Sequence, residues 1–267
     1  MISVTIKGLS LLQFDNLNRF PEILHFSTTR IGGKSEANYS SLNLGLNSGD
    51  SPDRVILNRE TLCSALEIKS DSFIFPKQTH TATVKVITKL FLSASIAERK
   101  HYLLDTDAVI TALHSICIAV KTADCVPVLL FDPKQKVIAA IHAGWRGTSQ
   151  NIVVETIQKM GEEFGSSPAD LIAGIGPSIS PAVYEVGADV HSQFDSAFYR
   201  DTNPVIKEKK LLNLWEANRQ QLLRAGVPTG QIELAQICTL SDPERFFSAR
   251  RDGAKTGRMG TGIMLKE

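Results

Sequence analysis

The sequence predicts one globular domain that mixes β-strands with α-helices, of the α/β or α+β class. Three apolar runs rich in Val and Ile stand close together in the middle of the chain, at Ile116–Val120, Val126–Phe131 and Val137–Ile141. Short runs of this kind, bounded by turn residues, predict buried strands. Helix signals lie on both sides of them. No linker, repeat or low-complexity stretch divides the 267 residues, so we expect a single domain over 1–267.

The composition is that of a soluble globular protein, with 43% hydrophobic residues, 21% charged residues and a net charge of +1. Without a basic excess we expect binding neither to nucleic acid nor to a membrane surface. The first residues lack the apolar core of a signal peptide, and no run of about 18 apolar residues could cross a bilayer. We therefore expect a cytoplasmic protein. The cysteines, Cys63, Cys117, Cys125 and Cys238, form no CxxC pair and predict free thiols.

The elements before the central strands follow from local signals. Residues 1–26 are typical of a strand, a turn and a second strand. Ser51-Pro52 supplies a helix N-cap followed by proline at the first helical position, which predicts a helix to about Leu66. Three further elements are predicted here: a strand at Ser72–Phe75, a strand at Thr83–Ile87 and a short helix within 88–104.

After the central strands, helices and strands alternate. A helix is predicted from Ser149 to Phe164 and closed by Gly165. The glycines of Gly144–Gly147 would then stand just before its N-terminus, where free N–H groups favour an anion. The remaining strands are predicted at Leu171–Ile175, Ile232–Ile237 and Ile263–Leu265.

Two more helices are predicted in the C-terminal half. Val190, Phe194 and Phe198 are spaced four apart, as on one face of a helix. Asn213 followed by Glu216 resembles a capping box that opens a helix to Ala225, with Gly226 just beyond it.

Three residues stand out as candidates for chemistry. His80 and His142 each follow a strand and precede small or polar residues, and Cys125 lies between two strands, whereas the other four histidines lack such a context. If the three side chains converge, they form a His₂Cys catalytic zinc pattern with an open fourth position. Alternatively, a cysteine beside a histidine is an activated thiolate. Sequence spacing alone leaves both chemistries open.

Positively charged residues in turns suggest that the protein binds an anion. Four arginines stand in or beside glycine-rich turns, and at least one of them is expected to bind an anion: Arg30, Arg146, Arg250 and Arg251. Asp124 and Glu185 are candidate acid–base groups. The motifs GxGxxG and GxxxxGK[ST] are absent, which argues against a Rossmann cofactor and a P-loop.

The chain resembles the YfiH family from Thr28-Thr29-Arg30 nearly to its end. The motifs that carry this resemblance are Gln78-Thr79-His80, Asp107-Ala108-Val109, Thr122-Ala123-Asp124-Cys125-Val126-Pro127, His142-Ala143-Gly144-Trp145-Arg146-Gly147, Gly174-Ile175-Gly176-Pro177 and Phe247-Ser248-Ala249-Arg250-Arg251-Asp252-Gly253. The family is also called the polyphenol oxidase or laccase domain-containing family, and its members are described as purine nucleoside phosphorylases.

The resemblance implies a compact α+β domain with two packed mixed sheets covered by helices. It implies that His80, Cys125 and His142 are the catalytic residues and bind zinc. It further implies phosphorolysis of adenosine, inosine and S-methyl-5′-thioadenosine to the purine base and the (methylthio)ribose 1-phosphate, with side deamination of adenosine. The partners would be purine nucleosides and phosphate, and the protein a monomer. Thr81 and Val183 depart from the family pattern and bear on substrate preference.

Three other functions compete with this interpretation. A copper polyphenol oxidase, the older family label, would need several copper centres, and six histidines with two well placed are too few. The second is a metal-free Cys–His hydrolase. The third is a binding module, such as a nucleotide-sensing protein, that retains the site without catalytic activity. Metal analysis separates the first two functions from the zinc enzyme, and turnover separates the binding module.

Overall fold

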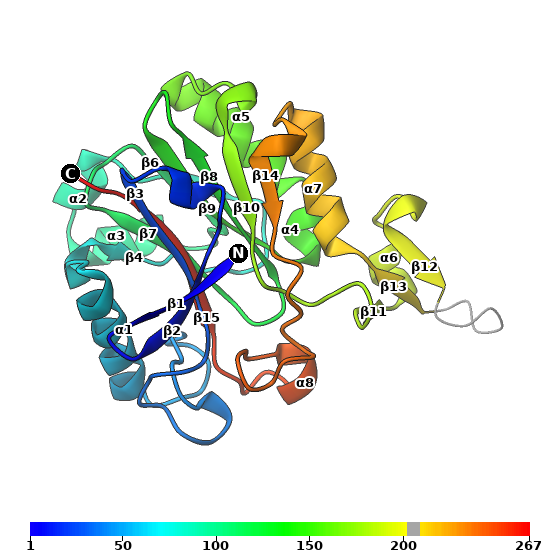
Figure 1. The fold of residues 1–267 in the computed structure, drawn as a ribbon, viewed down its shortest axis with the longest axis horizontal. Helices are drawn as coiled ribbons and strands as arrows, with labels where there is room; N and C mark the ends of the chain where they lie inside the picture. Colours follow the sequence, from blue (N-terminus) through cyan, green and yellow to red (C-terminus); the bar gives the residue numbers. More distant parts are fainter. Residues whose placement is uncertain (202–208) are drawn as a thin grey trace.

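Two six-stranded β-sheets pack face to face at the centre of the fold (Figure 1). The computed structural model describes residues 1–201 and 209–267. The first sheet has the order β1(Ile2–Ile6), β2(Leu9–Gln13), β3(Ile23–Thr28), β15(Met259–Leu265), β7(Cys117–Thr122) and β4(Phe73–Ile74). The second has the order β14(Ile232–Leu234), β10(Ile172–Ile175), β8(Val126–Asp132), β9(Val137–Ala143), β6(Ala108–Thr111) and β5(Val84–Val86).

Both sheets contain parallel and antiparallel pairs, which confirms the α+β class with two packed mixed sheets. A small third sheet lies at one end of the molecule and consists of β11(Glu185–Val186), β13(Lys210–Leu212) and β12(Tyr199–Asp201). The layer between the large sheets is apolar, with Ile118 and Val120 of β7 packed in one cluster with Leu129 of β8 and Ile138 of β9. Alternate residues of each strand point into this layer, as the period of two requires.

Helices cover the outer faces of the sheets (Figure 1). Helix α1(Pro52–Leu66) packs Leu62 and Leu66 with Phe26 over the first sheet. Helices α5(Ile152–Phe164) and α7(Leu214–Ala225) pack over the second sheet. Shorter helices are α2(Lys89–Ser93), α3(Ile96–Tyr102), α4(Trp145–Ser149), α6(Ala188–His191) and α8(Ala249–Asp252). Turns of 3₁₀ helix lie at Leu17–Arg19, Ala37–Tyr39, Ser70–Ser72, Pro168–Asp170, Ser196–Phe198 and Thr229–Gln231.

Elements with explicit end signals match their predictions most closely. Helix α1 begins at Pro52 and ends at Leu66, followed by Glu67 in the left-handed conformation. Helix α7 begins after Asn213, whose side chain accepts the backbone N–H of Glu216 at 3.0 Å. All four cysteines are free thiols, as predicted. In the part of the chain that the structure describes, no helix combines the length and the apolar character needed to cross a bilayer.

Two helix predictions are wrong in their extent. The predicted helix Ser149–Phe164 is divided at Asn151, which has φ +59°, so α4 precedes α5 and Gly147 lies inside α4 rather than before a helix. Asparagine tolerates this left-handed conformation at little cost. The predicted helix through Val190 and Phe198 ends at His191. Asp195 accepts the N–H of Ala197 at 2.9 Å, and such a local side-chain bond competes with helix continuation.

Other elements differ at their boundaries. The segment 88–104 holds two short helices instead of one, because Ser95 and Glu98 form a complete capping box that starts α3. Strand β14 ends at Leu234, three residues earlier than predicted, and β15 begins four residues earlier, at Met259. The three central apolar runs are strands, but β7 belongs to the first sheet while β8 and β9 pair in the second.

Candidate metal centre

His80, Cys125 and His142 converge at one end of the two packed sheets. Their ligand atoms all lie within 4.8 Å of one another. The imidazole rings of His80 and His142 have centroids 4.9 Å apart and planes inclined by 73°. Cys125 lies in the turn that carries the chain from β7 in one sheet to β8 in the other, and His142 ends β9 opposite Pro127 of β8. Strand ends therefore hold two of the three side chains.

The close packing of the centre requires a glycine at position 144, two residues after His142. A Cβ atom at this position would lie 3.0 Å from Cδ2 of His80 and 3.1 Å from Sγ of Cys125. Contacts this short are tighter than ordinary van der Waals contact, so a larger residue would push the two side chains aside. The backbone of Gly144 thus forms one wall of the centre.

Asp107 orients the centre and is the functional residue to which sequence reasoning gave no role. Its fully buried carboxylate lies 2.6 Å from Nδ1 of His142. The same group accepts backbone N–H groups from His80 at 3.1 Å and Thr81 at 2.9 Å. Because Nδ1 of His142 is engaged by Asp107, Nε2 is the ring nitrogen left to interact with Cys125 or a metal ion, an arrangement commonly found behind metal-binding histidines. In the sequence, Asp107 could have been recognised as an aspartate that directly precedes the buried strand β6.

The charges of the centre favour a thiolate. Burial raises the pKa of Cys125, but the imidazoles of His142 and His80 outweigh this effect and lower it. Burial lowers the pKa of His142, but the Cys125 thiolate and Asp107 outweigh it and raise the value. Asp107 stays ionised because the hydrogen bond from His142 overcomes its burial and lowers its pKa to about 2.

These donors fit a metal ion. One thiolate, two imidazoles and an exposed side at His80 match a three-ligand zinc site with an open position, and they also suit copper. Within residues 1–201 and 209–267, this is the single cluster of at least three histidine, cysteine, aspartate or glutamate side chains close enough to hold one ion.

Asp124 and Glu185, the two candidate acid–base groups, are engaged elsewhere. The carboxylate of Asp124 accepts hydrogen bonds from the hydroxyls of Thr239 at 2.7 Å and Ser248 at 2.9 Å and from the N–H of Arg250 at 2.7 Å. It thereby fixes the turn that presents Cys125. Glu185 is 41% exposed and pairs with Lys209 at 2.9 Å.

Arg146 and Arg250 lie against aromatic rings. The guanidinium of Arg250 lies 5.1 Å from the ring centroid of Tyr184, and that of Arg146 lies 4.2 Å from the ring centroid of Trp145. Burial raises the pKa of Tyr184, and the Cys125 thiolate raises it further, which places this tyrosine within electrostatic range of the centre.

Arg30 and Arg251 support loops. Arg30 donates to the carbonyls of Ser40 at 2.6 Å and Pro243 at 3.0 Å. Arg251 donates to the carboxylate of Asp252 at 2.9 Å and to the carbonyl of Phe246 at 2.9 Å. A substrate-binding role for the four arginines stays a prediction.

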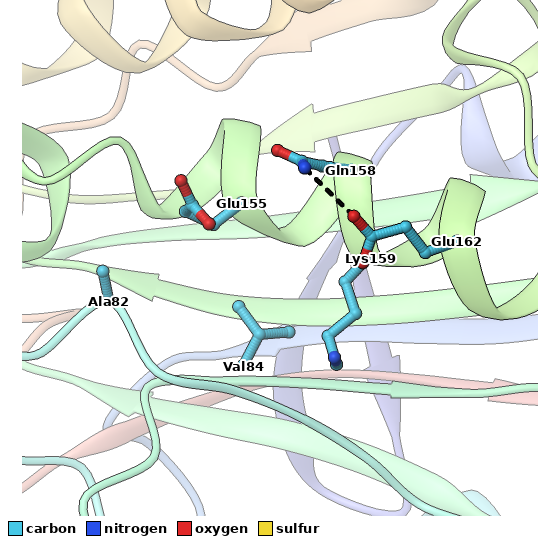
Figure 2. Close-up of a pocket in the computed structure, with 6 residues that line it drawn as sticks. All are labelled: Ala82, Val84, Glu155, Gln158, Lys159 and Glu162. Carbon is cyan, nitrogen blue, oxygen red and sulfur yellow. Dashed lines mark hydrogen bonds between the residues drawn. The ribbon is translucent and has the colours of Figure 1, made fainter.

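A separate pocket lies away from this centre, between α5 and the edge strand β5 (Figure 2). Its volume is about 210 Å³, and its lining residues are Ala82, Val84, Glu155, Gln158, Lys159 and Glu162. On the α5 side, Gln158 donates to Glu162, one helical turn further along, at 3.0 Å. None of the three convergent residues lines this pocket, so it is distinct from the candidate centre.

Known proteins share sequence similarity with nearly the whole of this chain. A family model described as multi-copper polyphenol oxidoreductase laccase matches residues 24–266. A purine nucleoside phosphorylase of Bacteroides thetaiotaomicron is 45% identical over 269 aligned positions, which cover 99% of each chain. Adenosine deaminase RL5, from an unknown prokaryotic organism, is 38% identical over 90% of this chain and 93% of its own.

A solved structure shows the same fold. The crystal structure of the hypothetical protein YfiH of Bacillus licheniformis superposes with a TM-score of 0.87 and 34% identity, covering 97% of both chains. The family match over residues 24–266 therefore includes His80, Cys125 and His142. On these grounds the chain belongs to the multi-copper polyphenol oxidoreductase laccase family, the family of the YfiH proteins.

Proposed function

We propose that this protein is a zinc-dependent purine nucleoside phosphorylase. Its substrates would be adenosine, inosine and S-methyl-5′-thioadenosine, together with phosphate. The observation that carries the proposal is the convergence of His80, Cys125 and His142. The relatives named purine nucleoside phosphorylase support the reaction class.

The reaction requires a positioned anion and a proton for the purine. An oxygen of dihydrogen phosphate bonds to C1′ while the bond from C1′ to the purine nitrogen breaks. The electron pair of that bond leaves with the purine, which takes up the proton from phosphate, so atoms and charge balance. Holding both reactants in one site replaces a bimolecular encounter with an oriented one.

Residues of the centre have distinct roles in this proposal. His80, Cys125 and His142 would hold the zinc ion, and Asp107 would keep the ring of His142 in the orientation that turns Nε2 toward the centre. Bound zinc would supply Lewis acidity or a water molecule that ionises near neutral pH. Tyr184, with Arg250 against its ring, would form an edge of the nucleoside site.

Deamination of adenosine is a second candidate activity, favoured by the relative named adenosine deaminase. Water would add at C6 of the purine and ammonia would leave, so this reaction consumes no phosphate. Both activities are compatible with one open metal position.

A copper oxidase is less well supported, although the family description refers to laccases. Multi-copper chemistry needs several metal centres, and the described residues offer the single cluster noted above. The paired thiolate and imidazole of Cys125 and His142 keep a metal-free hydrolase as an outcome of the test. A monomeric state and a cytoplasmic location stay predictions.

The deciding experiment incubates metal-analysed protein with adenosine, with and without phosphate, and identifies the products. We expect adenine and ribose 1-phosphate only when phosphate is present, and inosine in both conditions. Free ribose in equal amounts with and without phosphate would show a hydrolase instead. Oxidation of phenols that depends on bound copper would support the laccase alternative.

A further inference from the structure

Three cationic side chains gather on the outer side of the first sheet, near the metal centre. Arg59 comes from α1, Lys121 from β7, and Arg258 directly precedes β15. Arg59 and Lys121 face the same ring: Cζ of Arg59 lies 4.6 Å and Nζ of Lys121 lies 4.8 Å from the centroid of Phe75. We call these three residues the cation cluster.

The loop residue Leu44 joins two members of the cluster. Its carbonyl accepts Nε of Arg59 at 3.0 Å and Nη2 at 2.6 Å. Its N–H donates to the carbonyl of Arg258 at 3.0 Å. The neighbouring Gly45 leaves room for Arg258, because a Cβ there would lie 2.7 Å from Cγ of Arg258. The positions of Arg59 and Arg258 are thus built into the fold.

The cation cluster has no anionic partner among residues 1–201 and 209–267, where none of its members forms an ion pair. The side chains donate to neutral carbonyls instead: Nζ of Lys121 to Pro76 at 2.8 Å, and Nη1 of Arg258 to Gly257 at 2.9 Å. All three are partly buried. Partly buried positive charges without a counter-charge are unfavourable, which makes the cluster a place where an anion would bind.

Mutual repulsion among the three positive charges also favours the binding of an anion at the cluster. Burial, together with the positive charges of Arg59 and Arg258, lowers the pKa of Lys121 to about 7 against the attraction of Asp107. Burial also lowers the pKa of Arg258, while the Cys125 thiolate raises it. A bound anion would relieve this repulsion by favouring the charged form of the lysine.

The cluster is connected to the metal centre through Gln78. The side-chain amide of Gln78 donates to the carbonyl of Lys121 at 2.7 Å and accepts its N–H at 2.9 Å. Gln78 stands two residues before His80, and Lys121 stands four residues before Cys125. The hydrogen-bonded pair of Gln78 and Lys121 therefore connects the cation cluster with the two chain segments that carry His80 and Cys125.

We propose that Arg59, Lys121 and Arg258 form the subsite that binds inorganic phosphate for phosphorolysis. The inference rests on the proposed function for the identity of the anion. Among the described residues, Nε and Nη2 of Arg258 and Nη1 of Arg59 donate no hydrogen bond and remain available to phosphate oxygens. Guanidinium groups bind such oxygens through short, charge-assisted bonds. This subsite differs from the four arginines that the turn pattern indicated.

The test measures binding and kinetics separately with the zinc-loaded enzyme. Inorganic phosphate is titrated by ³¹P NMR, and the KM values for phosphate and for adenosine are determined. The variants are Lys121→Gln and Arg258→Gln, and the control is Lys136→Gln, a surface lysine paired with Glu22. Circular dichroism and zinc content confirm that each variant is folded and loaded.

We expect each cluster variant to raise the phosphate KM and dissociation constant about tenfold or more, because a charged hydrogen-bond donor is lost. The adenosine KM should change much less, and the control should match the wild type. If both variants bind phosphate as the wild type does, the subsite is wrong even where phosphorolysis occurs. If the wild type binds phosphate through this cluster but releases no purine, the subsite stands and the proposed function fails.

Discussion

The carboxylate of Asp107 lies 2.6 Å from Nδ1 of His142 and also accepts the backbone N–H of His80 at 3.1 Å. One buried side chain therefore orients two of the three proposed metal ligands. The third ligand, Cys125, is presented by a turn that the neighbouring Asp124 fixes through its own hydrogen bonds. Two adjacent carboxylate networks thus position the centre without contributing a ligand to it.

Replacing Asp107 by asparagine should weaken metal binding. The amide keeps the size of the carboxylate but loses its charge and one of its acceptors, so His142 and His80 are held less firmly. We expect zinc affinity to fall about 10- to 100-fold, as for other partners of metal-binding histidines. Chelator competition measures the change. Asp105→Asn is the matched control, because this exposed residue accepts the hydroxyl of Thr79 at 3.1 Å without touching His142. Equal affinities in the two variants would contradict the orienting role.

Adding one methyl group at Gly144 should disturb the centre while leaving the fold intact. In Gly144→Ala the new Cβ would meet His80 at 3.0 Å and Cys125 at 3.1 Å. Its φ of −69° suits alanine, so the effect comes from the contacts and not from the backbone. We expect reduced zinc content with an unchanged circular dichroism spectrum. Gly230→Ala, where nothing lies within 4 Å of the added atom, should keep full zinc content.

Cys125 should act as a metal ligand and not as a covalent nucleophile. We expect purified protein to contain about one zinc ion per chain, and Cys125→Ser to lose it. Cys238→Ser should retain the metal, since Cys238 lies outside the convergent group. Intact mass after quenching with adenosine should show no added group. A glycosyl adduct mapped to Cys125 would favour the hydrolase alternative.

His25 should make stability depend on pH. This histidine is 2% exposed and accepts the N–H of Phe14 at 2.9 Å through Nε2. Burial lowers its pKa from 6.5 to about 4. The unfolded chain therefore takes up a proton at higher pH than the folded one. The stabilising contribution is complete above pH 6.5 and is lost as the pH falls toward 4.

Between pH 7 and pH 5 this loss should amount to about 2 kcal/mol in the free energy of unfolding. Urea denaturation at the two pH values measures it. In His25→Gln the difference should shrink, because glutamine has no proton to gain, whereas His101→Gln, at an exposed site, should behave as the wild type. A pH dependence that survives His25→Gln would assign it to another group.

Local patterns were sufficient for the elements whose ends carry their own signals. Pro52 at the first helical position marks the start of α1, and the capping side chain of Asn213 marks that of α7, because both signals depend on neighbouring residues alone. The central apolar runs identified β7, β8 and β9 for the same reason. Because Cys125 and His142 stand at the ends of such runs, the sequence alone indicates them as candidates, whereas His80 lies in the loop between β4 and β5.

Contacts between distant parts of the chain decided the rest. Which sheet each central strand joins depends on packing that a short sequence window does not contain. Asp107 acts on His142 across 35 positions. The cation cluster assembles from Arg59, Lys121 and Arg258 in three separate elements. The sequence by itself determined the chemistry available at the strand ends, whereas only the tertiary structure decided which buried charges meet, because electrostatic interactions depend on distance in space rather than along the chain.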